Sequence, residues 1–425
     1  MKLPLTLTID MFERLPVPFG LVRYGVAPDH PKLKQPTLVY DKIARSAGFA
    51  FLGNVAVGRD VTLEEVRSTH HAILFACGAE LDKRLGLANE DLPGSRTATE
   101  FVGWYNGHPE YRDRSFDLSG DVVAIIGQGN VALDVARILA KPVEELRSTD
   151  IAAHALDVLA ESRIKEIHII GRRGPAQANF TTKELRELGE LKGYSTEINA
   201  QDLLLNPASQ IELENKTNFS AAGNVEVFRS WTARVPAAGS KRIVFHFLQS
   251  PVALHGHERL DHLTLEQTEL VGPAFGQTCR GTGLTSILKC NLLFRSIGYR
   301  GRPLPGVPFD EAKGVIPNIA GRIGEDRGLY AAGWIKRGPS GIIGTNRADA
   351  VATVQSIAAD LDSLDPRPKP GASPLRPLLA SRGKRIVGYE DWLRIDAVER
   401  SRGESKGKPR EKLIHINEML SLLES

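Results

Sequence analysis

Residues 121–139, DVVAIIGQGNVALDVARIL, place the strongest constraint on the fold of this chain. An apolar strand runs directly into a G-x-G-x-x-A turn, from Gly127 to Ala132, and then into a helical pattern with one apolar face. In this order Gly127 permits the tight turn, Gly129 lets a pyrophosphate approach the backbone, and Ala132 lets the helix pack closely on the strand. The free N–H groups at the start of the helix favour phosphate. The segment therefore predicts an α/β unit that binds a dinucleotide, with an ordinary strand-to-helix turn as the alternative.

The next strand of this unit, IKEIHII, ends close to two arginines, Arg172 and Arg173. An acidic residue at this position would favour the 2′-hydroxyl of NAD(H), whereas paired guanidinium groups suit a phosphate. The pair therefore favours NADP(H), and two solvated surface arginines are the alternative. Because the spacing from Gly127 to Arg172 is longer than usual, we expect an extended helical insertion over residues 141–160.

A second signal of this kind lies near the start of the sequence, where the alternating segment LTLTIDMF ends on Glu13. An acid at a strand end is where a dinucleotide-binding fold holds a ribose hydroxyl, roughly 20 residues after a glycine-rich turn. Twelve residues precede Glu13, and none of them is glycine. We therefore expect the first βα unit of this second site to be missing.

A glycine-rich loop also follows a strand late in the sequence, in GLYAAGWIKRGPSGIIGTNRADAVATV. A short strand ends at Trp334, residues 338–344 form the loop, and a long helix is expected over about residues 341–361. A helix N-terminus directed at a flavin would stabilise the negative charge of the reduced ring. A strand, loop and helix of purely structural importance is the alternative.

Composition excludes several other classes of protein. The sequence is 42% hydrophobic and 25% charged with a net charge of +3, which is typical of a globular protein and gives no reason to expect nucleic-acid binding. No apolar run is long enough to span a bilayer. The three cysteines form no CxxC motif, so a disulfide framework, a zinc site and a redox dithiol are not expected, and we expect buried thiols at Cys77, Cys279 and Cys290. The adjacent His70 and His71 lack other metal ligands nearby in sequence.

Segments along the whole chain resemble those of the NADPH–adrenodoxin (ferredoxin) oxidoreductases of mitochondria and their bacterial relatives. The matching segments are PFGLVRYGVAPDHP, GNVAVGRDVT, FVGWYNGHPE, GQGNVALDVARIL, GRRGPAQANFTTKELREL, SIGYRGRPLPGVPFD, GWIKRGPSGIIGTNRAD and SRGESKGKPREKL. They extend from about Asp10 to the C-terminus, with a looser match over residues 193–289. The last segment favours the mitochondrial branch.

The resemblance implies an α/β fold with two Rossmann-like dinucleotide-binding domains, the NADP domain being inserted into the FAD domain, whose first βα unit is missing. The implied boundaries are residues 1–82 for the first, N-terminally truncated part of the FAD-binding domain and residues 83–298 for the NADP-binding domain. Residues 299–425 then form the second part of the FAD-binding domain and the C-terminal tail.

The resemblance also implies the cofactor-binding residues. It assigns FAD to Glu13, Leu21, Val55, Trp334, Gly341, Ile342 and Ile343. It assigns NADP to Gln128, Gly129, Asn130, Val131, Arg172, Arg173, Glu184 and Gly341. His30 and Glu184 are the implied catalytic residues, with His30 near the flavin. From the residues alone, His30 is equally a turn histidine, and Glu184 is explained by its place in the first turn of a helix.

The implied function is that of a flavoprotein reductase that passes electrons from NADPH through FAD to a small, acidic, adrenodoxin-type 2Fe-2S ferredoxin. The implied protein is a monomer of the mitochondrial matrix, with no nucleic-acid partner and at most peripheral membrane association. The first ten residues do not form a targeting segment, so import would need a segment outside this sequence. We expect Arg186, Lys336 and Arg337 to form a basic face for the ferredoxin.

Two alternatives stay open. In the first, the truncated chain binds NADP but binds FAD weakly or not at all, and is not catalytic. In the second, the protein is a related flavoprotein with another electron acceptor, such as the flavoprotein subunit of glutamate synthase. Such subunits usually carry cysteine clusters, whereas this sequence contains three scattered cysteines.

Overall fold

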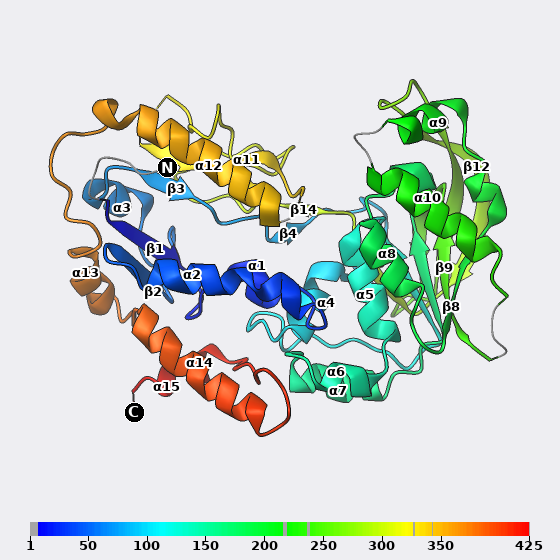
Figure 1. The fold of residues 1–425 in the computed structure, drawn as a ribbon, viewed down its shortest axis with the longest axis horizontal. Coiled ribbons are helices and arrows are strands. Elements are labelled where there is room, and N and C mark those ends of the chain that lie inside the picture. Colours follow the sequence, from blue (N-terminus) through cyan, green and yellow to red (C-terminus); the bar gives the residue numbers. More distant parts are fainter. Residues whose placement is uncertain (1–6, 216–218, 236–238, 326–327, 342, 425) are drawn as a thin grey trace.

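The computed structural model describes residues 7–215, 219–235, 239–325, 328–341 and 343–424. Two α/β units lie next to each other along the long axis of the molecule (Figure 1). One contains the middle of the sequence and a large sheet. The other combines the beginning of the described chain with residues that follow the large sheet.

The larger unit is built on a six-stranded sheet in which every strand pairs in parallel with its neighbours. Its strands, in spatial order, are β5 (Ser95–Thr97), β13 (Leu292–Arg295), β6 (Val122–Ile126), β7 (Glu166–Ile170), β9 (Lys241–His246) and β8 (Tyr194–Ile198). The strand expected at residues 122–126 is confirmed as β6. Its sequence VVAII is apolar throughout because both faces of the sheet are covered.

Helices cover one face of this sheet and a small antiparallel sheet covers the other. The helices of the unit are α4 (Ala98–Tyr105), α5 (Asn130–Ala140), α6 (Val143–Arg147), α7 (Ala153–Ala160), α8 (Thr182–Leu188), α9 (Pro207–Glu214) and α10 (Phe219–Thr232). Ile125 packs in the core on the helical side, whereas Ala124 and Ile126 pack against the antiparallel sheet. That sheet consists of β10 (Gln249–His255), β11 (His262–Val271) and β12 (Thr278–Lys289).

The insertion expected over residues 141–160 is helical but not continuous. It forms the two short helices α6 and α7, separated by residues 148–152. Asp150 in this break is almost fully buried and pairs with Lys34 and Lys412, two residues from distant parts of the chain. The break therefore provides a buried anion to which other segments attach.

The smaller unit contains two separate two-stranded parallel sheets among the described residues. β1 (Ile9–Glu13) pairs with β2 (Phe49–Gly53), and β3 (Ile73–Phe75) pairs with β15 (Leu329–Ala331). Its helices are α1 (Gly20–Tyr24), α2 (Pro36–Ala44), α3 (Leu63–Thr69), α11 (Trp334–Arg337) and α12 (Ile343–Ala359). The long helix expected near residues 341–361 is confirmed as α12. Within the described part of the chain, β1 and β3 each have one strand neighbour.

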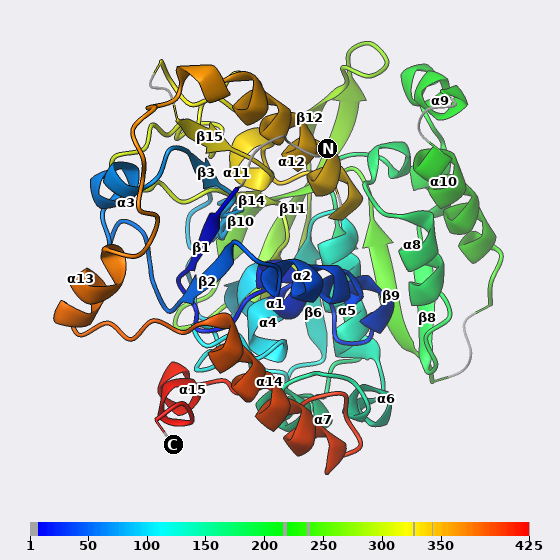
Figure 2. The same ribbon diagram turned by 60° about the vertical axis from the view of Figure 1, so that its left-hand side comes forward.

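The chain crosses between the units twice, and the two crossings lie side by side. β4 (Leu81–Asp82) enters the larger unit and pairs in antiparallel fashion with β14 (Tyr299–Arg300), which leaves it. The tail then forms α13 (Leu375–Ser381), α14 (Tyr389–Glu404) and α15 (Ile416–Ser421). In Figure 1, α14 runs below α2 towards α6 and α7, and the second view also shows it beneath both units (Figure 2). Short 3-10 turns occupy Pro31–Lys34, Pro175–Gln177, Ala200–Leu203 and Leu361–Ser363.

The cysteines differ from the expectation. Cys290 is buried, but Cys77 is exposed and Cys279 is half-buried. Cys77 lies in the loop after β3, and Cys279 lies on β12, an edge strand of its sheet, so neither is enclosed on all sides. None of the helices in the described ranges is long and apolar enough to cross a membrane.

Candidate active site at the junction of the two units

The glycine turn between β6 and α5 is open where a nucleotide would approach it. Gly127 has a φ of +144°, and a Cβ atom there would lie 2.1 Å from the carbonyl oxygen of Ser296, so this position requires glycine. Gly129 is the N-cap of α5, and a Cβ atom there would meet no atom within 4 Å. No side chain in the described ranges caps this helix with a hydrogen bond. The first N–H groups of α5 are therefore available to a phosphate.

The turns after β6 and β7 are in direct contact. The Gln128 side chain lies over Gly171, where a Cβ atom would be 1.8 Å from it. Gln128 Nε2 also donates a hydrogen bond to the Arg173 carbonyl at 3.3 Å. Asn130 accepts a hydrogen bond from the Thr181 N–H at 2.8 Å. Val131 is partly buried and packs against the core of the larger unit. The predicted residues of this turn are thus brought together with the arginine pair.

Arg172 and Arg173 are held through their backbones. The Arg172 carbonyl accepts from Thr268 Oγ1 at 2.7 Å, and the Arg173 carbonyl accepts from the Leu248 N–H at 3.2 Å. In the part of the chain that the structure describes, neither guanidinium has an ion-pair partner. Two positive charges without an ion-pair partner in the described chain, at the carboxyl edge of the sheet, suit a phosphate group.

His30 reaches from the smaller unit to helix α8 of the larger one. Its Nε2 atom lies 3.0 Å from Oε2 of Glu187, and the ring is 15% exposed. Glu184 is bonded instead by Thr181, whose Oγ1 donates to it at 2.8 Å. Sequence reasoning named Glu184 but missed Glu187. The two acids are three positions apart on one helix, and this spacing, which puts them on one face, is the signal that could have found Glu187.

The carboxyl groups around His30 differ in their tendency to bind a proton. Burial raises the pKa of Glu184, and the hydrogen bond from Thr181 offsets part of this shift. Burial also raises the pKa of Asp134 on α5, against the opposing charge of Arg137. Burial alone would raise the pKa of Asp29, but Arg137 and Lys141 hold it well below its ordinary value. The junction therefore combines one firmly ionised carboxylate with two that bind a proton more readily.

Two of the predicted FAD residues, Glu13 at the end of β1 and Val55 just after β2, are hydrogen-bonded to each other. Glu13 ends β1, its Oε1 accepts from the Leu15 N–H at 3.1 Å, and its backbone carbonyl accepts from the Val55 N–H at 2.9 Å. Burial raises the pKa of Glu13, and the Leu15 hydrogen bond lowers it. Val55 is buried, whereas Leu21 on α1 is 53% exposed.

The other predicted FAD residues follow β15. Trp334 opens α11 and stacks on Tyr299, with ring centroids 5.6 Å apart. Gly341 is exposed with a φ of +80°, and a Cβ atom there would lie 2.7 Å from Thr345 Oγ1. Ile342 lies outside the described residues, and Ile343 is the first residue of α12. The predicted FAD residues thus come from both strand pairs of the smaller unit.

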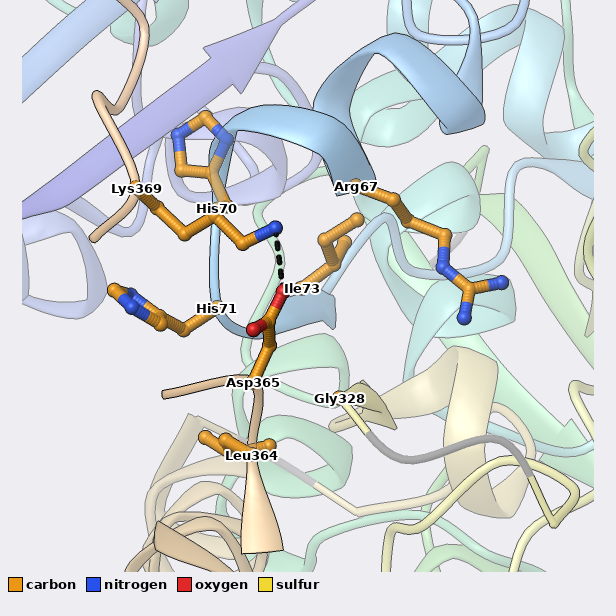
Figure 3. A pocket seen from close by; sticks show the side chains of 8 residues that line it. All are labelled: Arg67, His70, His71, Ile73, Gly328, Leu364, Asp365 and Lys369. Carbon is orange, nitrogen blue, oxygen red and sulfur yellow. Dashed lines mark ion pairs between the residues drawn. The ribbon is translucent and has the colours of Figure 1, made fainter. Parts of the chain in front are cut away.

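A small pocket lies away from this junction, between the end of α3 and the connector that follows α12 (Figure 3). Its volume is about 140 Å³. In Figure 3, Lys369 points at Asp365, with which it pairs at 2.9 Å, and the Arg67 guanidinium points away from the cavity. His70 pairs with Asp10 at 2.9 Å. Asp10 also accepts a hydrogen bond from the Ala372 N–H at 2.8 Å, which joins the connector to the smaller unit. Among the described residues, no three His, Cys, Asp or Glu side chains are arranged to hold a metal ion.

A parallel sheet, an uncapped helix behind an open glycine turn and two arginines without an ion-pair partner in the described chain are typical of an NADP(H)-binding α/β protein. No family model matches the sequence. Over 427 residues the chain is 44% identical to the NADPH-ferredoxin reductase FprA of Mycobacterium leprae, covering 98% of this chain and 92% of that protein. It is also 44% identical to the mitochondrial NADPH:adrenodoxin oxidoreductase of Homo sapiens, over 98% and 87% of the two chains.

The solved structure of Mycobacterium tuberculosis FprA in complex with NADPH superimposes with a TM-score of 0.94 at 43% identity, covering 99% of this chain and 94% of that one. The chain therefore belongs to the family of NADPH-ferredoxin reductases and NADPH:adrenodoxin oxidoreductases. The family resemblance seen in the sequence is confirmed. The bacterial and mitochondrial relatives are equally similar to this chain, at 44% identity.

Proposed function

We propose that this protein reduces a small iron–sulfur ferredoxin with electrons from NADPH, using FAD as its resident cofactor. The observation that carries the proposal is the open turn at Gly129 beside Arg172 and Arg173, two arginines without an ion-pair partner in the described chain. The relatives of this chain are named for NADPH and for ferredoxin or adrenodoxin, which supports both the electron donor and the acceptor.

NADP(H) would be held mainly by the larger unit. The N–H groups of Gly129, Asn130 and Val131 at the start of α5 would bind the pyrophosphate, with Gln128 beside them. Arg172 and Arg173 would bind the 2′-phosphate in the bidentate manner of guanidinium groups. Glu184 and Gly341, from the two units, would lie near the nicotinamide end.

FAD would be held by the smaller unit. Glu13 fits a ribose hydroxyl because its carboxylate stands at a strand end, where its Oε1 accepts a hydrogen bond from the Leu15 N–H. Leu21, Val55, Trp334 and the start of α12 would complete the site. The chemistry that FAD supplies when bound is acceptance of a hydride from NADPH and release of two electrons, one at a time.

The chain's own residues would align the two sites and manage a proton between them. His30 Nε2 and Glu187 Oε2 share a hydrogen bond, so this pair can hold a proton where the units meet. Glu184 on the same helix adds a carboxyl group whose burial favours the protonated form. Contact of α8 with the His30 loop would also limit the access of water to the junction.

We assign residues 1–82 and 299–425 to the FAD-binding domain and residues 83–298 to the NADP-binding domain. The side-by-side pairing of β4 with β14 supports these boundaries, because both crossings between the units occur there. Limited proteolysis tests the assignment. The assignment is supported if the protease cuts outside residues 83–298 and leaves a stable fragment of about that length. Stable fragments that end inside the six-stranded sheet contradict the assignment.

We propose an acidic 2Fe-2S protein of the adrenodoxin type as the electron acceptor. Arg186 is exposed on α8 and supports a basic docking face. Lys336 pairs with Asp349 at 2.8 Å and Arg337 donates to Ser340, so their charges are partly engaged. A monomeric state, a location in the mitochondrial matrix and at most peripheral membrane association complete the proposal. Gel filtration and cell fractionation test these points.

The central experiment is reduction of a purified 2Fe-2S ferredoxin by NADPH, followed by the loss of the visible absorbance of the oxidised cluster. We expect turnover that depends on both this protein and NADPH and that NADH supports poorly. Absence of turnover with a fully flavin-loaded preparation would contradict the proposed function.

A second candidate function is NADP(H) binding without flavin chemistry. It is favoured by the two short sheets of the smaller unit, because β1 and β3 each have a single strand neighbour among the described residues. The visible spectrum of the purified protein separates the two candidates. A stoichiometric flavin band supports the reductase. The second candidate is supported if the protein binds NADP but shows no flavin band, even after FAD is added.

A further inference from the structure

The segment that carries His30 is tied to the larger unit at three successive points. Each tie is an ion pair or a hydrogen bond between a residue of this segment and a helix or helix junction of the other unit. The pairs are Asp29 with Arg137 and Lys141 on α5, His30 with Glu187 on α8, and Lys34 with Asp150 between α6 and α7. The segment therefore spans the interface between the two proposed cofactor sites.

The first of these ties has the most restrictive geometry. Arg137 Nε donates to Asp29 Oδ2 at 2.7 Å, and its Nη2 donates to Asp29 Oδ1 at 3.0 Å. This is a two-point contact between a planar guanidinium and a carboxylate, which fixes orientation as well as distance. Both side chains are 3% exposed, so solvent does not compete for the contact.

Arg137 also binds the helix from which it projects. Its Nη2 donates to Asp134 Oδ1 at 2.6 Å, one turn earlier on α5. The remaining nitrogen, Nη1, is buried and has no hydrogen-bond partner among the described residues. A buried ion pair with an unsatisfied donor is no better for stability than well-packed apolar side chains. Its presence at this interface is better explained by the geometry that it imposes.

α5 links this contact to the nucleotide site. The helix begins at the Gly129 turn, where the pyrophosphate would bind, and Arg137 lies two turns further along. The residue that follows Asp29 is His30. A rigid helix with a nucleotide at one end and the Asp29 contact at the other therefore fixes the position of His30 relative to the nucleotide. Asp134 on α5 and Glu184 on α8 interact electrostatically with His30, and Glu187 is hydrogen-bonded to it. The cations of these helices pair with the neighbouring acids, Arg137 and Lys141 with Asp29 and Lys183 with Glu187.

We propose that Arg137 is a positioning residue, which acts through Asp29 to hold the His30 loop in register with the nucleotide-binding helix. The inference rests on the proposed function, because His30 takes part in the proposed reaction. Arg137 itself touches neither reacting group. Its role is to fix the distance between two sites carried by different units.

The kinetic test uses Arg137→Met, Arg137→Lys, Asp29→Asn and the double variant in the flavin-loaded protein. We expect kcat for NADPH-dependent ferredoxin reduction to fall about 100-fold in Arg137→Met, because small misplacements at a reacting centre cost this much. The KM for NADPH should change less than about threefold, since the Gly129 turn and the arginine pair are untouched. The double variant should be no worse than Arg137→Met, and Arg137→Lys should recover part of the loss.

The matched control is Arg147→Met. Arg147 is also an arginine in an ion pair near the end of a helix of the same unit, but it is 55% exposed and pairs with Glu144 on its own helix. We expect this variant to keep the kcat of the unchanged protein. An equal loss of kcat in Arg147→Met would show a general effect of removing an arginine from this unit and would overturn the inference.

Hydrogen exchange of the protein without added cofactor tests the same inference independently of activity. We expect the amides of residues 26–34 to exchange about tenfold faster in Arg137→Met while α5 stays protected. If the unchanged protein lacks reductase activity, the proposed function fails, but this measurement still decides the role of Arg137. Unchanged exchange and unchanged kcat in a folded Arg137→Met variant overturn the inference. If that variant does not fold, Asp29→Asn, which removes the same contact from the loop side, decides by the same two criteria.

Discussion

The Nε2 atom of His30 lies 3.0 Å from Oε2 of Glu187, although 157 positions separate the two residues in sequence. His30 belongs to the smaller unit and Glu187 to helix α8 of the larger one. We predict that Glu187→Gln lowers kcat about tenfold and that His30→Gln lowers it more, because a positioned acid–base group contributes to proton transfer. Steady-state turnover with a ferredoxin measures this. Glu190→Gln, an exposed acid just after α8, should leave kcat unchanged, and a larger effect there would contradict the prediction.

The arginine pair provides a prediction on cofactor choice. Arg172→Ala combined with Arg173→Ala should weaken NADPH binding about 100-fold, because each guanidinium loses a charge-assisted contact with the 2′-phosphate. NADH binding should change less than about threefold. Titration calorimetry with both nucleotides measures the ratio, with Lys192→Ala, an exposed cation of the same unit, as the control. An equal loss for both nucleotides would show that the pair does not recognise the 2′-phosphate.

The two glycines of the turn should respond differently to substitution. Gly129→Val should keep the free energy of unfolding within about 1 kcal/mol, because its side chain enters open space, but should abolish nucleotide binding. Gly127→Val should lower that free energy by about 3 kcal/mol or more, since the φ of +144° and the nearby Ser296 carbonyl exclude a side chain. Urea unfolding and nucleotide titration check both expectations. Strong binding by Gly129→Val would remove this turn from the site.

His108 provides a prediction on pH dependence. Its ring is almost fully buried between Tyr24 and Tyr111, and its Nδ1 accepts the Glu110 N–H at 3.2 Å. Burial, with a smaller contribution from Arg14, lowers the pKa of His108 from 6.5 to about 3. The unfolded chain therefore binds this proton more tightly than the folded one, and stability falls as pH decreases from 6.5 towards 3.

For this single group, the expected slope over that interval is about 1.4 kcal/mol per pH unit. His108→Phe keeps an aromatic ring between the two tyrosines and removes the titration. Its unfolding free energy should therefore depend less on pH between 6.5 and 3, while both proteins behave alike above pH 7. Denaturant unfolding at a series of pH values measures the difference. Parallel curves for the two proteins would contradict a buried neutral histidine.

The sequence was sufficient to predict those parts of the fold that rest on local patterns. The strand VVAII, the helix that begins at Asn130 and the long helix α12 each follow from a periodicity or a glycine turn within a short stretch. The arginine pair was placed correctly at the end of β7 for the same reason. Family membership was also predicted, because its motifs are spread over most of the chain.

The contacts between distant segments could not be predicted in this way. The pairing of His30 with Glu187, and not Glu184, depends on how the loop of residues 27–31 meets α8, which no local pattern determines. The Asp29–Arg137 contact joins residues 108 positions apart. The exposure of Cys77 was missed because an apolar sequence, AILFAC, does not show that its last residues leave the strand.

The anchoring of Arg172 and Arg173 through their carbonyl oxygens has a consequence for the history of such proteins. Thr268 and Leu248 hold the loop by its main chain, so the identity of the two side chains is not tied to the integrity of the fold. Selection can exchange them one at a time and shift the preference between phosphorylated and unphosphorylated nucleotides, with the intermediates still folded. Coenzyme preference in this scaffold is therefore an evolvable trait, separable from the architecture that carries it.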